Sequence, residues 1–307
     1  MEKIFSKKNS LIIGCILVLI LISTLIGSEL ILRNIPNDYQ YKANYLKQNG
    51  SKIKTLILGN SHTLNGINPT LLPNAFNAAH SAQPYEYDWK ILEKNYSNLP
   101  HLKTIIIPVS YFSYTINFKE GGLKNRIKDY NIYYGIHTGD YSLKNNFEIF
   151  HQSIDLNYSR FKKFQINPVN EINSNLDGSP KKRRNIDINK YNSTETVKKH
   201  TYPYDQNVIN GNIYYLNQIL NFSQKNNIKV ILVSFPTSKT YFDNMDLNQF
   251  NHWKMTTTDL TTKYSNVSWM NFLEDSGNFD QSDFIDADHL NQQGADKLTQ
   301  QITFQLQ

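Results

Sequence analysis

The stretch Lys54-Thr-Leu-Ile-Leu-Gly-Asn-Ser-His62 decides the fold of this chain. Its apolar run ends abruptly in glycine and small polar residues, which is typical of a buried parallel strand that leads into a tight turn. The residues just beyond the carboxyl ends of such strands are where α/β sheets bind ligands. Gly59 permits the turn, and Ser61 then starts a helix whose amides favour a developing negative charge. Ser61 is therefore a candidate nucleophile, unless Asn60 and Ser61 only cap that helix.

Four further segments have the apolar, β-branched composition of strands. They are residues 76–79, 104–110, 228–235 and 267–272. Helical spacing of apolar residues occurs between and after them. It covers residues 85–96, 207–226, 249–264 and 294–305. Strands that alternate with helices predict an α/β fold, a three-layer sandwich with a mainly parallel, flavodoxin-like sheet.

The N-terminus has the composition of a membrane anchor. Basic residues, Lys7 and Lys8 among them, precede an apolar segment over residues 11–32. A helix needs about 20 mainly apolar residues to cross a bilayer, and basic residues before the span favour an N-terminus inside the cell. A cleaved signal peptide is the alternative, but this run is long for one and no clear small-residue cleavage site follows it. We expect a single-pass cell-membrane protein with an extracytoplasmic domain.

This anchor divides the rest of the chain into predicted regions. Residues 1–10 are cytoplasmic, 33–52 form a juxtamembrane linker, and 53–307 form the α/β domain, with a variable insertion at about 115–204. The insertion contains the basic run 178–184, which we interpret as a solvated loop, the alternative being a patch for anionic lipid or polymer. The net charge of +6 is modest and does not indicate a nucleic-acid partner. The single cysteine excludes an intrachain disulfide.

A second motif, Asp286-Ala-Asp-His289, stands just before the last predicted helix. A carboxylate three residues before a histidine can turn back towards the imidazole Nδ1, which fixes the tautomer and stabilises the imidazolium. Asp283 and Asp288 are rivals for this role. Asp288 is adjacent to the histidine and would have to turn its side chain sharply, so Asp286 is preferred.

Together the two motifs resemble those of the SGNH (GDSL-like) hydrolase superfamily, most closely its membrane-anchored branch that acts on envelope polysaccharides or lipids. The resemblance extends from about Lys54 to the C-terminus and is sharp only at its two ends, with Gly59-Asn-Ser in place of Gly-Asp-Ser. It implies that Ser61 is the nucleophile, His289 the general base and Asp286 its orienting partner. An α/β-hydrolase would place its serine mid-chain and separate its aspartate widely from its histidine.

The middle of the family pattern is altered in this chain. Where the family offers a glycine amide to the oxyanion, Ala82 stands here, and its amide serves equally if its backbone angles allow. Where the family offers an asparagine side chain after a strand, this chain has Ser110, a weak donor. The resemblance thus implies an oxyanion hole of the Ser61 and Ala82 amides with Ser110. Loss of one donor costs about 3 to 4 kcal/mol of transition-state stabilisation.

Three residues are candidates for substrate contact. His62 follows the serine, while Lys239 and Tyr241 follow the end of the fourth predicted strand. Each has a plainer interpretation as an ordinary loop residue. The histidines are scattered, without a His-Glu-x-x-His motif or clustered cysteines, so the sequence predicts no metal site and no cofactor.

Two functions are consistent with these observations. The first is a membrane-tethered serine esterase or O-acyltransferase that acts on acylated cell-envelope polysaccharide or lipid through an acyl-enzyme. A membrane protein that donates acyl groups is a further expected partner in the transfer reaction. The second is a non-catalytic envelope protein that keeps the fold to bind a glycan or a partner. The second function is favoured because this chain has Ser110 where the family has an asparagine.

Overall fold

The computed structural model describes residues 7–118, 121–139, 141–166, 172–182, 193–201, 205–274 and 277–306. The chain divides into two compact units. The first comprises Met1–Tyr41 and Asn125–Ile172, and the second Lys42–Lys124 and Asn173–Gln307. The predicted insertion at 115–204 thus contributes to both. Residues 1–6 of the segment predicted to be cytoplasmic and the end of the basic run, residues 183 and 184, lie outside the described residues.

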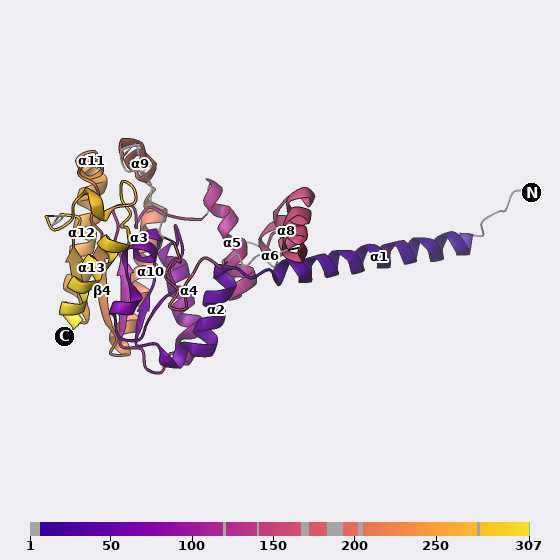
Figure 1. Ribbon diagram of the computed structural model, residues 1–307, viewed down its shortest axis with the longest axis horizontal. Helices are drawn as coiled ribbons and strands as arrows, with labels where there is room; N and C mark the ends of the chain where they lie inside the picture. Colours follow the sequence, from indigo (N-terminus) through magenta and orange to yellow (C-terminus); the bar gives the residue numbers. More distant parts are fainter. Residues whose placement is uncertain are drawn as a thin grey trace, which may run out of the picture. The chain divides into compact units, whose positions relative to one another are not determined.

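The second unit is built on one five-stranded sheet with the strand order β2-β1-β3-β4-β5 (Figure 1). Every neighbouring pair of strands is parallel. The strands are β1 (Thr55–Ile57), β2 (Ala75–Asn77), β3 (Thr104–Pro108), β4 (Lys229–Ser234) and β5 (Val267–Asn271). This order is the flavodoxin-like one, in which the ligand crevice lies where β1 and β3 diverge. The predicted α/β class with a parallel sheet is confirmed.

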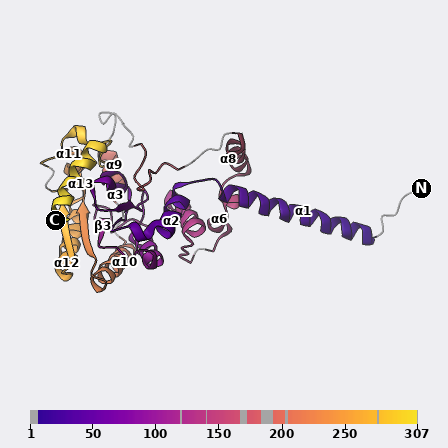
Figure 2. The same cartoon turned by 60° about the horizontal axis from the view of Figure 1, so that its bottom comes forward.

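Helices cover both faces of this sheet (Figure 2). The longer ones are α4 (Tyr85–Asn95), α10 (Gln206–Lys225), α12 (Leu247–Lys263) and α13 (Gln292–Leu306). Shorter ones are α3 (Ser61–Gly66), α9 (Ser193–His200) and α11 (Lys239–Asp243). Right-handed crossovers place α4, α10 and α12 on one face and α3 and α13 on the other. Accordingly, α4 packs against α10, and α3 against α13.

The core forms where the strands present consecutive apolar residues to both faces, as strands covered on both sides do. Ile57, Ile106 and Ile231 lie side by side in the strand register and are fully buried. They pack with Leu298 and Ile302 of α13. This layer fixes α13, the helix that follows the Asp-His motif, against the face on which α3 begins.

The first unit contains the N-terminal helix α1 (Lys7–Arg33) and a group of short helices. These are α5 (Ile127–Asp129), a π-helical turn over Tyr130–Tyr134, α6 (Leu143–Asn146), α7 (Glu148–His151) and α8 (Ile154–Ile166). The segment predicted as a linker contains α2 (Asp38–Asn49) and a 3₁₀ turn over Gly50–Lys52.

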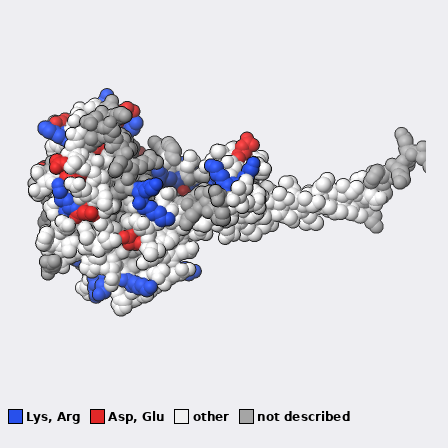
Figure 3. Space-filling model, in the orientation of Figure 1, with Lys and Arg blue, Asp and Glu red and all other residues white. Residues whose placement is uncertain are grey.

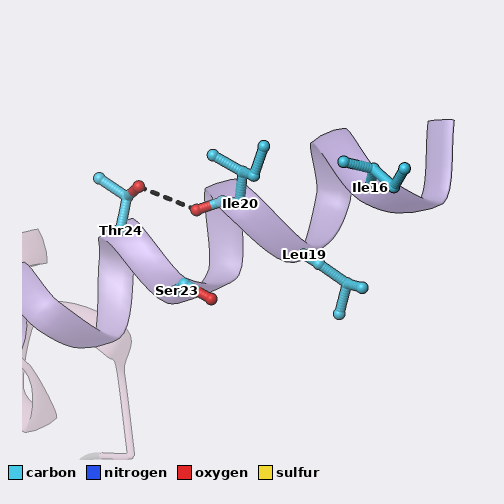
Figure 4. Close-up of a pocket in the computed structure, with 5 residues that line it drawn as sticks. All are labelled: Ile16, Leu19, Ile20, Ser23 and Thr24. Carbon is cyan, nitrogen blue, oxygen red and sulfur yellow. Dashed lines mark hydrogen bonds between the residues drawn. The ribbon is translucent and has the colours of Figure 1, made fainter. Parts of the chain in front are cut away.

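Within the described chain, α1 is the one helix long and apolar enough to cross a membrane, over residues Asn9–Arg33. Its middle carries no charged side chain (Figure 3). A hydroxyl in lipid needs an internal partner, and the Thr24 hydroxyl donates to the carbonyl of Ile20 at 2.8 Å (Figure 4). The polar side of α1 near Thr24 is therefore compatible with a spanning helix.

Replacing Gly59 by alanine tests the turn after β1. Gly59 has φ +108° and a Cβ there would overlap the Pro108 ring, so we expect Gly59→Ala to lower the free energy of unfolding by about 2 to 4 kcal/mol. Gly211→Ala is the matched control, because Gly211 lies in α10 with open space around it, and alanine there should add about 1 kcal/mol. Urea unfolding measures both. Equal effects of the two substitutions would contradict this account of the turn.

Candidate active site

The turn after β1 brings Ser61 to the carboxyl edge of the sheet. The Gly59 amide donates to Asp88 Oδ1 at 2.7 Å, which holds the turn against α4. Asn60 caps α3, its side chain accepting from the His62 amide at 2.9 Å. Capping is thus performed by Asn60, which leaves the Ser61 hydroxyl available for another partner.

That partner is His289. Its Nε2 lies 2.8 Å from Ser61 Oγ, and its Nδ1 lies 2.9 and 3.0 Å from the two carboxylate oxygens of Asp286. In the neutral imidazole, Nδ1–H donates to Asp286 and Nε2 accepts the hydroxyl proton of Ser61. The structure therefore brings together the serine, histidine and aspartate that the sequence singled out, in the order of a nucleophile, a base and an orienting carboxylate.

The Asp286 carboxylate is itself fixed by its own loop. It accepts hydrogen bonds from the amides of Asp288 and His289, at 3.1 and 2.9 Å. The rival Asp283 points elsewhere, accepting from the Asp280 amide and from Lys297 Nζ at 2.6 Å. Asp286 is therefore the aspartate that contacts the imidazole most closely.

The other rival, Asp288, belongs to a second chain of hydrogen bonds. Its Oδ2 lies 3.0 Å from His62 Nε2, and His62 Nδ1 lies 2.8 Å from Ser110 Oγ. All three side chains are buried. Burial is the main reason that the pKa of His62 is lowered, so its imidazole is neutral, donates from Nε2 to Asp288 and accepts the Ser110 proton at Nδ1.

A third histidine faces the same carboxylate. His200 Nδ1 lies 3.5 Å from Asp288 Oδ2 and 2.8 Å from the Tyr241 hydroxyl. Burial lowers the pKa of His200 to about 4, so this ring too is neutral at physiological pH. Asp288 thus faces His62, His200 and His289, whose Nδ1 lies 3.4 Å from its Oδ1.

These carboxylates determine the charge of His289. Burial by itself lowers the pKa of His289, but the charge of Asp288 and the hydrogen bond and charge of Asp286 outweigh it and raise the pKa to about 9. For Asp288, burial opposes ionisation, and the charge of His289 with the hydrogen bond from His62 nevertheless holds its pKa well below the usual range. The site therefore contains an ion pair of Asp288 and His289 at neutral pH.

The predicted oxyanion donors lie in two different environments. Ala82 has φ +56°, in the left-handed region that favours glycine. Its loop is joined to the turn after β1, because the His80 amide donates to the Gly59 carbonyl at 3.1 Å. The Ser110 hydroxyl donates its proton to His62, so that proton is not directed towards a substrate. Its amide donates to Ser113 Oγ at 2.8 Å.

The three residues predicted to contact substrate also lie in different surroundings. Lys239 is largely exposed and pairs with Asp243 at 2.7 Å. Tyr241 is 1% exposed and hydrogen-bonds His200, so it supports the histidine cluster. His62 is 4% exposed and fully engaged with Asp288 and Ser110.

One trio has the residue types of a metal site. Single ligand atoms of His62, Asp288 and His289 lie within 4.8 Å of one another. Each of these side chains already has a hydrogen-bond partner in the network, and those bonds explain the cluster without an ion. His62 is 226 residues from Asp288 in the chain, so no local ligand spacing in the sequence could have indicated this group.

From the sequence alone, His200 and Asp88 were not identified as residues that support the site. His200 gave no signal, because it acts through contacts that form only in the folded chain. Burial raises the pKa of Asp88 to about 8, and its Oδ1 binds both the Gly59 amide and Gln83. A buried polar residue inside the amphipathic pattern of 85–96 was the one available clue.

The comparisons with known proteins identify no family. No family model matches the chain, and no curated protein matches it. Among solved structures, a crystal structure of a proposed acylhydrolase from Bacteroides fragilis is similar, with 10% sequence identity and a TM-score of 0.40. The match covers 85% of this chain and 92% of that one.

Substitution of Asp288 by asparagine tests the electrostatics of the site. Because the Asp288 charge raises the pKa of His289, we expect that pKa to fall from about 9 towards the ordinary 6.5 in Asp288→Asn. NMR titration of the imidazole measures it. Asp243→Asn is the control, since Asp243 pairs with Lys239 alone among the described ion pairs. An unchanged His289 titration in Asp288→Asn would refute the ion pair.

Proposed function

We propose that this chain is a membrane-tethered serine esterase or O-acyltransferase whose substrate is an acylated cell-envelope polysaccharide or lipid. The observation that carries the proposal is the continuous hydrogen-bonded path from Ser61 Oγ through His289 to Asp286, with distances of 2.8 and 2.9 Å. A serine whose proton is taken by an oriented imidazole becomes a nucleophile towards an ester carbonyl. The apolar length of α1 supports the membrane tether.

The reaction follows from this geometry. Ser61 Oγ attacks the ester carbonyl carbon as its proton passes to His289 Nε2, and the amides of Ser61 and Ala82 are the proposed donors to the oxyanion. The tetrahedral adduct collapses, the C–O bond to the alcohol breaks, and His289 returns the proton to the departing alkoxide. Asp286 stabilises the imidazolium throughout. Water or a glycan hydroxyl then attacks the acyl-Ser61 ester by the reverse sequence.

Hydrolysis and transfer differ only in the acceptor of the acyl group. Transfer to a glycan would require a donor, and a membrane protein that supplies acyl groups remains the proposed partner for that case. The alternative function, a non-catalytic glycan- or partner-binding protein, is favoured by one observation. The hydroxyl of Ser110 is committed to His62, so the third oxyanion donor of the resembled family has no side-chain counterpart at this position.

Labelling with a fluorophosphonate probe decides between the catalytic and non-catalytic functions. Ser61 and Ser110 are both hydrogen-bonded to histidines, but Ser110 is 2% exposed. We expect the wild-type chain and Ser110→Ala to be labelled and Ser61→Ala to remain unlabelled, with ester turnover reduced about 10⁴-fold or more in Ser61→Ala. Mass spectrometry of the labelled peptide locates the adduct. A wild-type chain that is never labelled would support the binding protein.

The pH dependence of p-nitrophenyl acetate turnover tests the role of His289 as base. Only neutral imidazole accepts the Ser61 proton, so a pKa of about 9 predicts a rate that rises about tenfold per pH unit and levels off near pH 9. Spontaneous hydrolysis is subtracted with Ser61→Ala. A plateau already reached at pH 7 would show that the free imidazole is not the group that limits turnover. The same assay with an added polysaccharide acceptor measures how the acyl group divides between water and glycan.

A further inference from the structure

The short helices of the first unit are fastened to the end of α1. The Glu29 carboxylate accepts from the amides of Glu148 and Ile149 at 3.1 and 3.0 Å. Arg33 donates to the Asn146 carbonyl at 2.9 Å. These bonds join the last two turns of α1 to the junction of α6 and α7, so the position of α1 in a bilayer also sets the depth of these helices.

The length of α1 indicates that depth. Its apolar span covers 25 residues, Asn9–Arg33, and at about 1.5 Å per residue this is roughly 37 Å, against a hydrocarbon core of about 30 Å. The last turns of α1, which carry Glu29 and Arg33, therefore extend beyond the hydrocarbon into the headgroup region. The helices α6, α7 and α8 lie at this level.

These helices expose a set of large apolar side chains. We call it the α6–α8 apolar surface, and it consists of Leu143, Phe147, Phe150, Ile154 and Tyr158. Ile154 is 85% exposed and Tyr158, one helical turn later, is 63% exposed. The rings of Phe147 and Phe150 contact edge to face, with centroids 5.8 Å apart. Exposed apolar groups of this size mark a surface that is covered in the functional protein.

The charges around this surface fit an anionic headgroup layer. Lys144, Lys162 and Lys163 are exposed on the same helices, and Figure 3 shows basic and acidic side chains in this region. Of the acidic residues, Glu148 is buried and paired with Lys128 at 2.7 Å and Arg160 at 3.0 Å. Asp155 in the first turn of α8 is exposed, and the exposed lysines outnumber it. Apolar and aromatic side chains together with lysines are the composition of helices that lie in the membrane interface.

We propose that the α6–α8 apolar surface lies in the headgroup–acyl boundary of the leaflet at which α1 ends. The lipid bilayer is its occupant, because the surface is tied directly to the end of the spanning helix. The inference rests on α1 crossing the membrane and is independent of the chemistry of Ser61. It gives the first unit a function of its own, which is to hold the end of α1 at the membrane interface.

Site-specific fluorescence in vesicles tests the proposal. The full chain, with its single cysteine removed by Cys15→Ser, receives Ile154→Cys or the matched control Ser159→Cys and an environment-sensitive fluorophore. Ser159 is exposed on the same helix but five residues away, on a different side of α8. A label at Leu19→Cys reports insertion of α1. We expect phospholipid with a shallow nitroxide to quench the Ile154→Cys label at least about twofold more strongly than the Ser159→Cys label.

The other outcomes refute the proposal. Equal quenching at the two positions of α8, with the Leu19→Cys label quenched by a deep nitroxide, would show that α1 is inserted while the surface stays in water. A label at Ile154→Cys that is unquenched in vesicles of pure lipid but shielded in native membranes would assign the surface to a protein partner instead of lipid. Because no enzymatic step is measured, these results are separate from any failure of the proposed acyl chemistry.

Discussion

The close approach of Gly59 to the Pro108 ring is the contact on which the site depends. A side chain at position 59 would overlap that ring, so only glycine lets the end of β1 turn beside the end of β3 and start α3 there. The other half of the site comes from the opposite end of the chain. The Ile285 amide donates to the His289 carbonyl at 2.8 Å, which closes the Asp-His loop and aims its imidazole at Ser61.

Around this contact the Asp288 carboxylate faces three imidazoles. Two of them, His62 and His200, are kept neutral by burial, while His289 alone is raised in pKa because two aspartates face it. The same aspartate that raises the pKa of His289 also hydrogen-bonds His62, so these two histidines share one counter-charge. Asp288 therefore both positions His62 and raises the pKa of His289.

The sequence predicts the sheet well because β1, β3 and β4 are almost wholly buried and appear in the sequence as apolar runs that end in turn residues. The pairing of Ser61 with Asp286 and His289 was also predictable, since both motifs stand at strand or helix boundaries that a parallel sheet brings to one edge. The second hydrogen-bond chain was not. The contact of His62 with Asp288 joins residues 226 apart and depends on side-chain directions that no periodicity encodes. The ion pair of Lys239 with Asp243 in α11 was not predictable either, because a position after a strand end does not determine where a side chain points.

The distance in sequence between Ser61 and His289, 228 residues, has a consequence for how the protein is made. Three strands of the sheet are synthesised before the short helices α5 to α8 and two after them. A growing chain therefore contains Ser61 and most of the sheet long before it contains His289, and until then Ser61 lacks the imidazole that lies beside it in the folded chain. The hydrogen bond between Ser61 and His289 can therefore form only after the segment that precedes α13 has been synthesised and has docked on the sheet.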